Sequence, residues 1–481
     1  MATITSTGIG SGLDVNSIVT QLMALESRPL TLLQQAKSGL DTKMSAIGTL
    51  QSRMSALRDA SNALTSVTLW NQTVATSANA AAVKVSTASG AASGSYSVAV
   101  SRLAGGQTLA SPAFAASNTP VGEGTLTIEL GAWDEQLPPG FTPKNGAAPV
   151  AISIAPGEDS LAAIRDKING AGAGVTATLI TDASGTRLSL RSKETGAENA
   201  FRISASETLD DGNPATGLSA FAYDGAAGGP MTRSQTASNA LATINGIPIE
   251  SASNTLAGVA DGLTLTLSQV TSSAVEVSVA PDTAAMQKSI ETFVSAFNDV
   301  ANYIRDQTKY NPDTKVAGTL QGDRLVGSLQ TQLRGIVNQG SSASGTFERL
   351  TDIGITFTST GTLSISSSKL TDALGNLPEL RKVLAADGSD TGSSGFIDRF
   401  KDFASSVLGA EGAFENRTTS LKGQLSLNGK SQESMQRRLA QTEERLRRQY
   451  QALDTAMSSL SGTADYLTQQ LTLISNNSSK R

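Results

Sequence analysis

The sequence contains no histidine and no cysteine, and only 4% of its 481 residues are aromatic. The chain therefore lacks the usual general base near neutral pH, the thiolate nucleophile and the commonest ligands of transition metals. Serine–histidine–aspartate, cysteine–histidine and zinc chemistry are excluded, which leaves an enzyme only carboxylate, lysine or tyrosine chemistry. No motif nominates a pair of carboxylates, so we expect no catalytic residue, no cofactor and no metal site.

Excess charge of one sign and long apolar runs are also missing. The 37 Lys and Arg residues nearly balance the 42 Asp and Glu residues, giving a net charge of −5, so there is no general positive field to attract nucleic acid. Residues 1–12 lack the basic and apolar regions of a Sec-type signal peptide. No run of about 18 apolar residues occurs. We expect no nucleic-acid partner, no membrane insertion and, if the chain is exported, another export route.

A heptad repeat runs without a gap along the C-terminal part of the chain. Its d positions are Leu439, Leu446, Leu453, Leu460, Leu467 and Ile474. Of the a positions between them, only Glu443 is charged. This pattern predicts a helix of about 40 residues from near Ser431, about 60 Å long, which one small core cannot cover. An intramolecular bundle and a coiled coil of several chains both fit.

Charges flank this repeat at the spacing that suits an exposed helix face. Three acid–base pairs stand four residues apart with the acid first, which is the favourable order: Glu433/Arg437, Glu443/Arg447 and Glu444/Arg448. The arginines of this segment are interleaved with glutamates, so we interpret them as the outer face of a coiled coil.

Two further helical repeats are found toward the N-terminus and after the middle of the chain. The first has seam residues Leu33, Leu40, Ile47 and Met54, with apolar partners three residues later, interrupted by Lys43 and Ser61. A shorter helix with Asp14 or Asn16 as N-cap precedes it, and Pro29 separates the two. The second ends at Asn311-Pro312 and has the seam residues Met286, Ile290, Phe293, Phe297, Val300 and Ile304.

Between Thr73 and Pro281 the apolar period changes to two, which predicts strands. The fold class is therefore an α+β multidomain protein with long N- and C-terminal coiled-coil helices, a mixed helical core domain and nested antiparallel β-rich outer domains. We predict four parts: residues 1–50 with 436–481 as a helical leg, 51–75 with 283–435 as the core, 76–115 with 233–282 as a β-rich domain, and 116–232 as an outer β-rich domain.

Two segments of the middle region resemble each other. Ile168-Asn169-Gly170 and Ile244-Asn245-Gly246 share three residues and are each followed by a strand-like run, which suggests a duplicated small β unit. The acidic stretch Asp210-Asp211-Gly212 lacks the 12-residue register of a calcium loop. We interpret it as a solvated turn.

Several motifs, in a specific order, resemble a known family. The opening contains Gly8, Gly10, Gly12, Leu13 and Asp14, followed by Val15-Asn16-Ser17-Ile18, and it resembles the N-terminal signature of the bacterial flagellar filament cap proteins, the flagellar hook-associated protein 2 family. Further resemblances lie at Gly94–Val100, Ile244–Gly246, Asp352–Ile355 and Tyr450–Asp454. They cover nearly the whole chain and are weakest over residues 111–232.

The resemblance implies a secreted, non-enzymatic protein of the flagellum. Such a protein is exported unfolded through the flagellar type III apparatus with a dedicated chaperone. It forms a ring of identical subunits, expected to be a pentamer, at the filament tip, and it promotes the folding and insertion of exported flagellin. Some family members also adhere to mucus or host surfaces. The residues leave open a secreted glycan-binding adhesin on a helical stalk, a hook–filament junction protein and, more distantly, a glycosidase.

Overall fold

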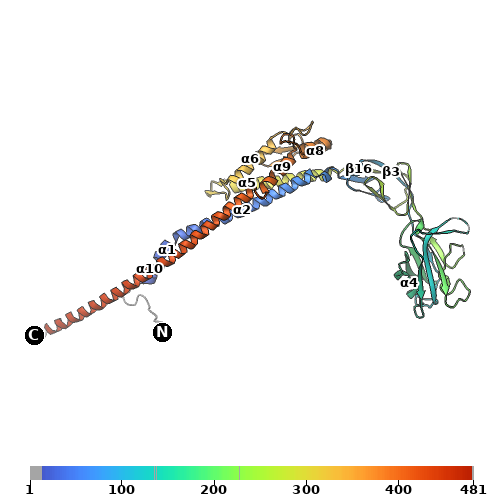
Figure 1. Ribbon diagram of the computed structural model, residues 1–481, viewed down its shortest axis with the longest axis horizontal. Helices are drawn as coiled ribbons and strands as arrows, with labels where there is room; N and C mark the ends of the chain where they lie inside the picture. The colour runs from blue at the N-terminus through green and yellow to red at the C-terminus, as the bar shows by residue number, and fades with distance from the viewer. Residues whose placement is uncertain (1–13, 135, 137, 227, 479–481) are drawn as a thin grey trace. The chain divides into compact units, whose positions relative to one another are not determined.

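The computed structural model describes residues 14–134, 136, 138–226 and 228–478, apart from the side chains of residues 474 and 476–478. The chain forms two compact units, one comprising residues 1–69 and 283–481 and the other Trp70–Asp282. The first is mainly helical and the second mainly β (Figure 1). The predicted α+β class with long terminal helices is confirmed, and the finer division into four parts stays a prediction. None of the described helices has the length and apolar character needed to cross a membrane.

The helical unit contains long helices and two short β-hairpins. Its elements are α1 (Val15–Glu26), α2 (Arg28–Thr65), α3 (Val67–Trp70), α5 (Thr283–Thr308), β17 (Tyr310–Asn311), β18 (Val316–Ala317), α6 (Arg324–Asn338), β19 (Ile355–Phe357), β20 (Leu363–Ile365), α7 (Ser367–Leu374), α8 (Leu377–Ala385), α9 (Phe396–Leu408) and α10 (Ala413–Ser478). Pro29 lies in the first turn of α2, where a missing N–H costs nothing, so α1 and α2 are separate helices as predicted.

The core of this unit forms where α2 packs against α5 and α9. All six predicted seam residues of α5 are buried: Met286, Ile290, Phe293, Phe297, Val300 and Ile304. The rings of Phe293 and Phe297 lie 5.3 and 5.6 Å from the ring of Phe400 in α9. Aromatic pairs at such distances stabilise a core beyond their buried area, and they fix α9 onto α5.

The C-terminal half of α2 supplies the third face of this core. Ile47, Leu50, Met54 and Leu57 are at most 1% exposed. Ser61, the polar interruption of the seam, is also fully buried, and its Oγ donates a hydrogen bond of 2.8 Å to the carbonyl of Leu57. A buried hydroxyl that is satisfied within its own helix costs little, which explains why the seam tolerates it.

The C-terminal helix begins earlier than predicted. α10 starts at Ala413 rather than near Ser431 and is 66 residues long. Phe414 and Leu421 are buried within its first turns, so packing against the core fixes this part of the helix. Gly423 and Gly429 concealed the extension, because glycine lowers helix propensity by about 1 kcal/mol relative to alanine.

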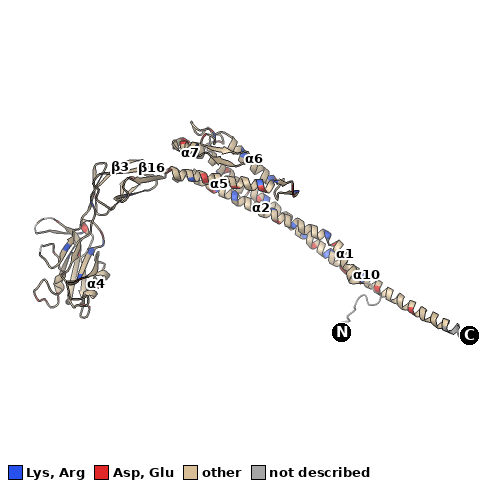
Figure 2. Ribbon diagram, turned by 180° about the vertical axis from the view of Figure 1, so that it is seen from behind, with Lys and Arg blue, Asp and Glu red and all other residues tan. Residues whose placement is uncertain are grey.

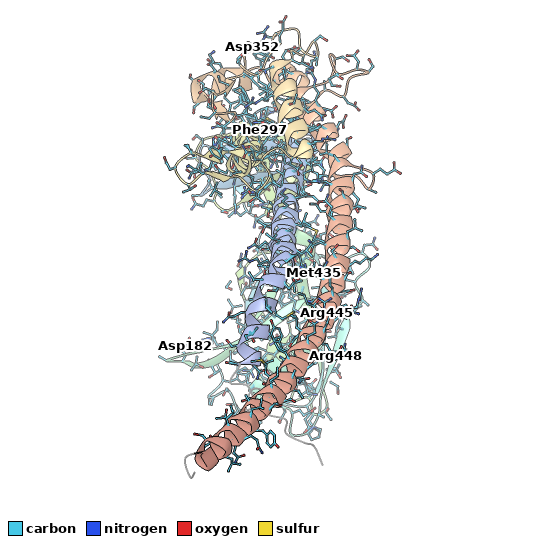
Figure 3. All side chains as sticks on the ribbon, turned by 90° about the vertical axis from the view of Figure 1, so that its left-hand side faces the viewer. Asp182, Phe297, Asp352, Met435, Arg445 and Arg448 are labelled. Carbon is cyan, nitrogen blue, oxygen red and sulfur yellow. The ribbon has the colours of Figure 1, made fainter. Side chains whose placement is uncertain are left out.

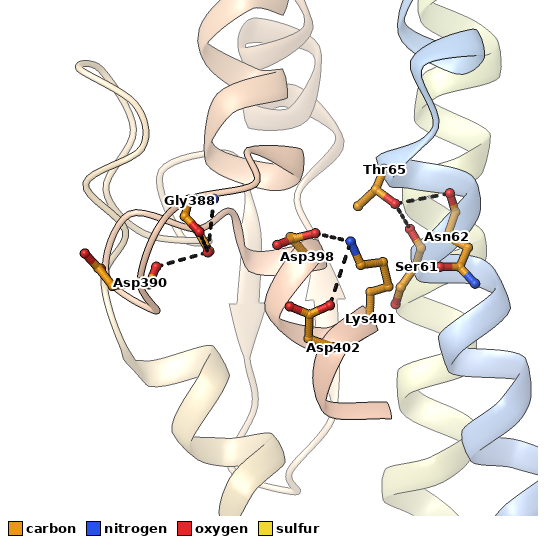
Figure 4. A network of polar contacts seen from close by, with 9 residues as sticks. Ser61, Asn62, Thr65, Gly388, Asp390, Asp398, Lys401 and Asp402 are labelled. Atoms are coloured by element: carbon orange, nitrogen blue, oxygen red, sulfur yellow. Dashed lines mark hydrogen bonds and ion pairs between the residues drawn. The ribbon is translucent and has the colours of Figure 1, made fainter. Parts of the chain in front are cut away.

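Polar side chains organise the loops beside α9. Buried Arg399 donates to the carbonyls of Gly340, Gly392 and Ser394 and so joins two loops. Asp398, which is also buried, pairs with Lys401 (Figure 4). The Arg399 contacts use one side chain of α9 to hold segments that have no regular structure of their own, whereas the Asp398–Lys401 pair lies within α9.

The carboxylate of Glu379 anchors the loop that precedes β19. It accepts hydrogen bonds of 2.8 Å from Lys382, 2.7 Å from the Ser344 hydroxyl and 2.8 Å from the Gly345 N–H. The bond from Lys382 and then the two loop donors lower the pKa of Glu379 to about 2. The ionised carboxylate is therefore the form that holds the loop.

The described part of the β unit contains antiparallel strands and the α-helix α4. Its elements are β1 (Thr73–Ser77), β2 (Val83–Thr87), β3 (Gly94–Arg102), β4 (Thr108–Ala110), β5 (Gly124–Trp133), β6 (Phe141–Pro143), β7 (Val150–Ile154), α4 (Leu161–Gly170), β8 (Val175–Asp182), β9 (Gly185–Ser192), β10 (Ala200–Glu207), β11 (Thr232–Gln235), β12 (Ala240–Ile244), β13 (Ile247–Ser251), β14 (Thr255–Ala260), β15 (Leu263–Leu267) and β16 (Val275–Pro281). The antiparallel sheets that were predicted here are confirmed.

The described strands surround two buried clusters. One lies between the sheet β1-β16-β3-β12-β13 and the sheet β14-β15-β2. The other lies among α4, the sheet built on β5 and the sheet β11-β4-β9-β8. The chain enters the second cluster after β3 and returns at β12, so the nesting predicted from the sequence is present.

Within the described residues, four amide side chains each pair with both the N–H and the C=O of another residue. These reciprocal pairs have lengths of 2.6 to 3.3 Å and join Gln107 to Phe201, Asn169 to Ala177, Asn254 to Ala104 and Asn298 to Leu363. Each amide satisfies a backbone donor and acceptor that would otherwise be unpaired. We call them amide brackets.

The predicted internal repeat is wrong. Asn169-Gly170 ends helix α4, whereas Asn245-Gly246 forms the two-residue turn between β12 and β13. The turn residues have φ of 50° and 80°, the left-handed conformation that Asn-Gly adopts in tight hairpins. The same tripeptide therefore lies in two unrelated backbones, and no duplication is needed to explain it.

Leu50 and Leu32 provide a matched test of the helical core, because both lie on α2 but are 0% and 64% exposed. Leu50→Ala should lower the free energy of unfolding of the helical unit by about 2–5 kcal/mol, since it leaves a cavity. Leu32→Ala should change it by no more than about 0.5 kcal/mol. Urea denaturation followed by circular dichroism of the helices measures both, and equal effects would contradict the described core.

Acid titration tests the anchor at Glu379. A carboxyl whose pKa is about 2 in the folded state and about 4.3 in the unfolded state stabilises the fold fully above the higher value. This contribution disappears as the pH falls through the lower one. The unfolding free energy should therefore decline less steeply between these pH values in Glu379→Gln than in the wild type. The exposed Glu411→Gln variant serves as control, and identical slopes in all three proteins would contradict the anchor.

Candidate assembly surface on the terminal helices

The N-terminal helices lie along α10 in the opposite direction. Asn428 of α10 donates a hydrogen bond of 3.1 Å to the carbonyl of Leu33, and Arg447 donates one of 3.2 Å to the side chain of Asn16. Residue numbers thus decrease on α10 as they increase along α1 and α2, and the ribbon shows the same antiparallel course (Figure 1). The sequence predicted that residues 1–50 and 436–481 form one leg, but it left open whether the partner helix belongs to the same chain, since a heptad encodes a seam but not its partner.

The predicted N-terminal signature lies mostly outside the described residues. Gly8, Gly10, Gly12 and Leu13 fall there, and of this set only Asp14 is described. The carboxylate of Asp14 accepts a hydrogen bond of 2.9 Å from the N–H of Ser17. It is therefore the N-cap of α1, which is one of the two caps that the sequence suggested.

The predicted seam residues fall into three groups by exposure. Ile47 and Met54 are buried in the core, whereas Leu33, Leu40, Leu439 and Leu446 are half-buried where α2, α1 and α10 lie together. Leu453, Leu460 and Leu467 are exposed, and the side chain of Ile474 lies outside the described residues. Packing within one chain therefore covers the seam only as far as about Leu446.

Beyond Leu446 the a and d positions of α10 form a continuous apolar row in solvent. The row consists of Leu453, Met457, Leu460, Ala464, Leu467 and Leu471, all of them exposed. From Gln449 onward the helix carries only Asp454 and Asp465 as charged residues. Because a polar helix would be expected in water, an exposed apolar row with this spacing indicates a surface for another helix. We call these six residues the exposed row.

Charged residues occupy the part of α10 that precedes the exposed row (Figure 2). Glu443 pairs with Arg447 at 2.8 Å and Glu444 with Arg448 at 3.6 Å, as predicted. Arg445 and Arg448 lie on the exposed surface of the helix (Figure 3). Glu433 and Arg437 have the same spacing, but no ion pair joins these two described residues.

The acidic turn at residues 210–212 is held by hydrogen bonds from its own loop. Glu207, Asp210 and Asp211 bring carboxylates within 4.8 Å of one another. However, Asp211 accepts from the Asn213 N–H and the Thr216 hydroxyl, which lower its pKa. The Ser219 N–H donates to Glu207. The loop itself thus satisfies these carboxylates, as expected of a solvated turn.

Family models match most of the chain. The model described as Flagellar hook-associated protein 2 N-terminus matches residues 11–107, and the one described as Flagellar hook-associated protein 2 C-terminus matches residues 237–462. The model of the Flagellin hook IN motif matches residues 140–194. The C-terminal match includes Leu453 and Leu460 of the exposed row.

Relatives align over almost the full length. Flagellar hook-associated protein 2 of Escherichia coli is 32% identical over 490 residues, covering 98% of each chain. The B-type flagellar hook-associated protein 2 of Pseudomonas aeruginosa is 31% identical over 500 residues, covering 99% of each chain. A crystal structure of three domains of the flagellar cap protein FliD from Escherichia coli superposes with a TM-score of 0.58 at 31% identity, covering 78% of this chain and 99% of that one. The chain therefore belongs to the flagellar hook-associated protein 2 family, the family of flagellar cap proteins.

Proposed function

We propose that this protein caps the flagellar filament as a ring of identical subunits and promotes the folding and insertion of exported flagellin. The observation that carries the proposal is the exposed row of α10, an apolar helix face that nothing in the described chain covers. Family membership supports capping, and the row supplies a surface through which a subunit can contact the filament or its neighbours.

The energetics of the row suit a contact that forms and releases. Full burial of a leucine or methionine side chain contributes roughly 1.5–3 kcal/mol, so the row offers on the order of 10 kcal/mol. Association costs an estimated 4–15 kcal/mol in lost freedom. A single leg would therefore bind weakly, and a ring that holds several legs at once would bind firmly while each leg exchanges. A cap that moves as subunits are added requires such exchange.

Several finer expectations stay predictions. They are the pentameric ring, export through the type III apparatus with a dedicated chaperone, and adhesion to mucus or host surfaces. An adhesin on a helical stalk would also expose apolar seam residues, but it would be dispensable for motility. The absence of an enzymatic activity is likewise an expectation from the composition and the family.

Complementation tests the proposal. Expression of this chain in a bacterium that lacks its own cap protein should restore filaments and motility and reduce the flagellin lost to the medium. The filaments are examined by electron microscopy, and the medium is assayed for flagellin. If export is confirmed but filaments do not form, the chain is supplied together with its cognate flagellin. Failure of that pair would overturn the capping function.

The exposed row can be tested separately from the fold. Leu453→Glu with Leu460→Glu should abolish filament growth, because charges placed at two central d positions oppose burial. Circular dichroism of the β unit should not change. Thr455→Glu with Ser459→Glu places the same charges on the opposite side of α10 and should leave filament growth intact. Normal capping by the first variant would contradict the assembly surface.

Hydrogen exchange on the isolated protein measures how the legs behave before assembly. Amides of residues 453–473 should exchange quickly, because their helix has no packed partner, whereas amides of residues 47–64 should be protected by the core. Amides of α1 should also exchange faster than the core. Equal protection of residues 453–473 and of the core would rule out a leg that orders on contact.

A further inference from the structure

A small hollow lies in the helical unit between α5, α6 and the turn that joins β19 to β20. It encloses about 230 Å³. It is distinct from the exposed row, and nothing in the proposed function uses it. Its lining divides into an apolar floor and a rim rich in hydrogen-bond donors.

The floor is built from core residues. Phe297 and Ile304 of α5 and Leu333 of α6 are each at most 3% exposed and present apolar surface to the hollow. Half-buried Ala301 lies between the two α5 residues in sequence and leaves space because its side chain is small. An inserted group would therefore need an apolar body, since burying a polar one without a partner is costly.

Basic groups stand at the rim. The guanidinium of Arg334 lies beside the turn, since its Nη2 is 3.5 Å from where a Cβ on Gly361 would stand. No described residue forms a hydrogen bond or ion pair with Arg334. Among the described residues, the guanidinium of Arg305 pairs only with the exposed carboxylate of Asp306, at 3.9 Å, and Lys309 shares that carboxylate at 3.2 Å. Two guanidinium groups thus face the hollow with little or no compensation.

No carboxylate is among the described residues that line the hollow. Gln330 and Ser359 add neutral donors for which the described chain shows no partner. The combination of an apolar floor, two guanidiniums and further donors at the rim is complementary to an anion on an apolar stem. A guanidinium forms its strongest hydrogen bonds with carboxylate and phosphate groups.

The hollow is held open by fixed parts of the fold. The amide bracket of Asn298 joins α5 to Leu363 at the start of β20. The hydroxyls of Thr358, Thr360 and Thr362 are hydrogen-bonded to one another at 2.7 to 3.1 Å, which stiffens the turn. A ligand would therefore meet a preorganised site and lose less free energy in ordering it.

We propose that this hollow binds a carboxylate carried on an apolar body the size of one amino-acid residue. A volume of about 230 Å³ is below the roughly 300–1,000 Å³ of sites for drug-sized molecules, so the ligand is small. Phosphate itself lacks the apolar body that the floor requires. The carboxylate can come from a free carboxylic acid or from the C-terminal residue of a protein, and both present the same chemistry.

The test uses N-acetyl-leucine and the folded full-length chain. Saturation-transfer NMR should show binding with a dissociation constant on the order of 1 mM, as expected for so small a ligand. N-acetyl-leucinamide, which lacks the charge, should bind at least about tenfold more weakly. No binding of the acid, or equal binding of acid and amide, would overturn the proposal.

Variants locate the site. Arg334→Gln should weaken binding at least about tenfold, and Ala301→Leu should abolish it by filling the hollow. Arg381→Gln removes an exposed arginine of α8 that does not line the hollow and should bind like the wild type. Circular dichroism confirms that each variant is folded. Unchanged binding in both Arg334→Gln and Ala301→Leu would place the ligand elsewhere and overturn the assignment.

A peptide distinguishes the two sources of the carboxylate. A six-residue peptide of glycine and serine that ends in leucine is compared in its free-acid and amidated forms. Binding of the free-acid peptide as tightly as N-acetyl-leucine supports the proposal and shows that the hollow accepts a protein C-terminus. Binding of N-acetyl-leucine alone supports it and restricts the ligand to small carboxylic acids.

Discussion

The helical unit depends on the burial of one face of α2. The C-terminal half of this helix is covered by α5 and α9, which come from the second half of the sequence, and its N-terminal half lies beside α10. Most of the stability of a helix in a protein comes from the packing of its apolar face, so the 38 residues of α2 depend on the helices that cover them. In the sequence, the β unit is inserted between α2, which supplies this face, and the segment that contains α5 and α9, which cover it. Closing the helical core therefore also brings together the two ends of the inserted unit.

Periodicity predicted the elements and much of the core, because a repeat of seven shows which face of a helix is apolar. This was sufficient for Met54 and Phe297, which are buried as expected. The same pattern at Leu453 and Leu460 marks a face that the chain itself does not cover. The spacing of apolar residues gives the seam and cannot say whether the partner belongs to the same molecule. That the row is exposed could therefore be recognised only from the structure.

Other features have no local signal at all. Arg417 of α10 binds Asp323, the N-cap of α6, through two hydrogen bonds across 94 residues of sequence. The hollow lined by Arg334 joins residues of α5, α6 and a turn that lie up to 64 residues apart in the chain, from Phe297 to Gly361. Conversely, the tripeptides around Asn169 and Asn245 have the same sequence but different backbone structures. Tertiary contacts decide whether such a tripeptide ends a helix or forms a hairpin turn.

The amide brackets also bear on how the chain avoids the wrong assemblies. Strands β8 and β10 are edge strands of their sheets. The outward N–H and C=O of Ala177 in β8 are hydrogen-bonded to the Asn169 amide, and those of Phe201 in β10 to the Gln107 amide. At a third margin, strand β13 carries Pro248, which has no N–H to donate. An unpaired edge strand can form hydrogen bonds with a strand of another chain, which leads to aggregation. These three edges are therefore less open to pairing with strands of other chains, whereas the exposed row of α10 leaves an apolar helix face open to a partner helix.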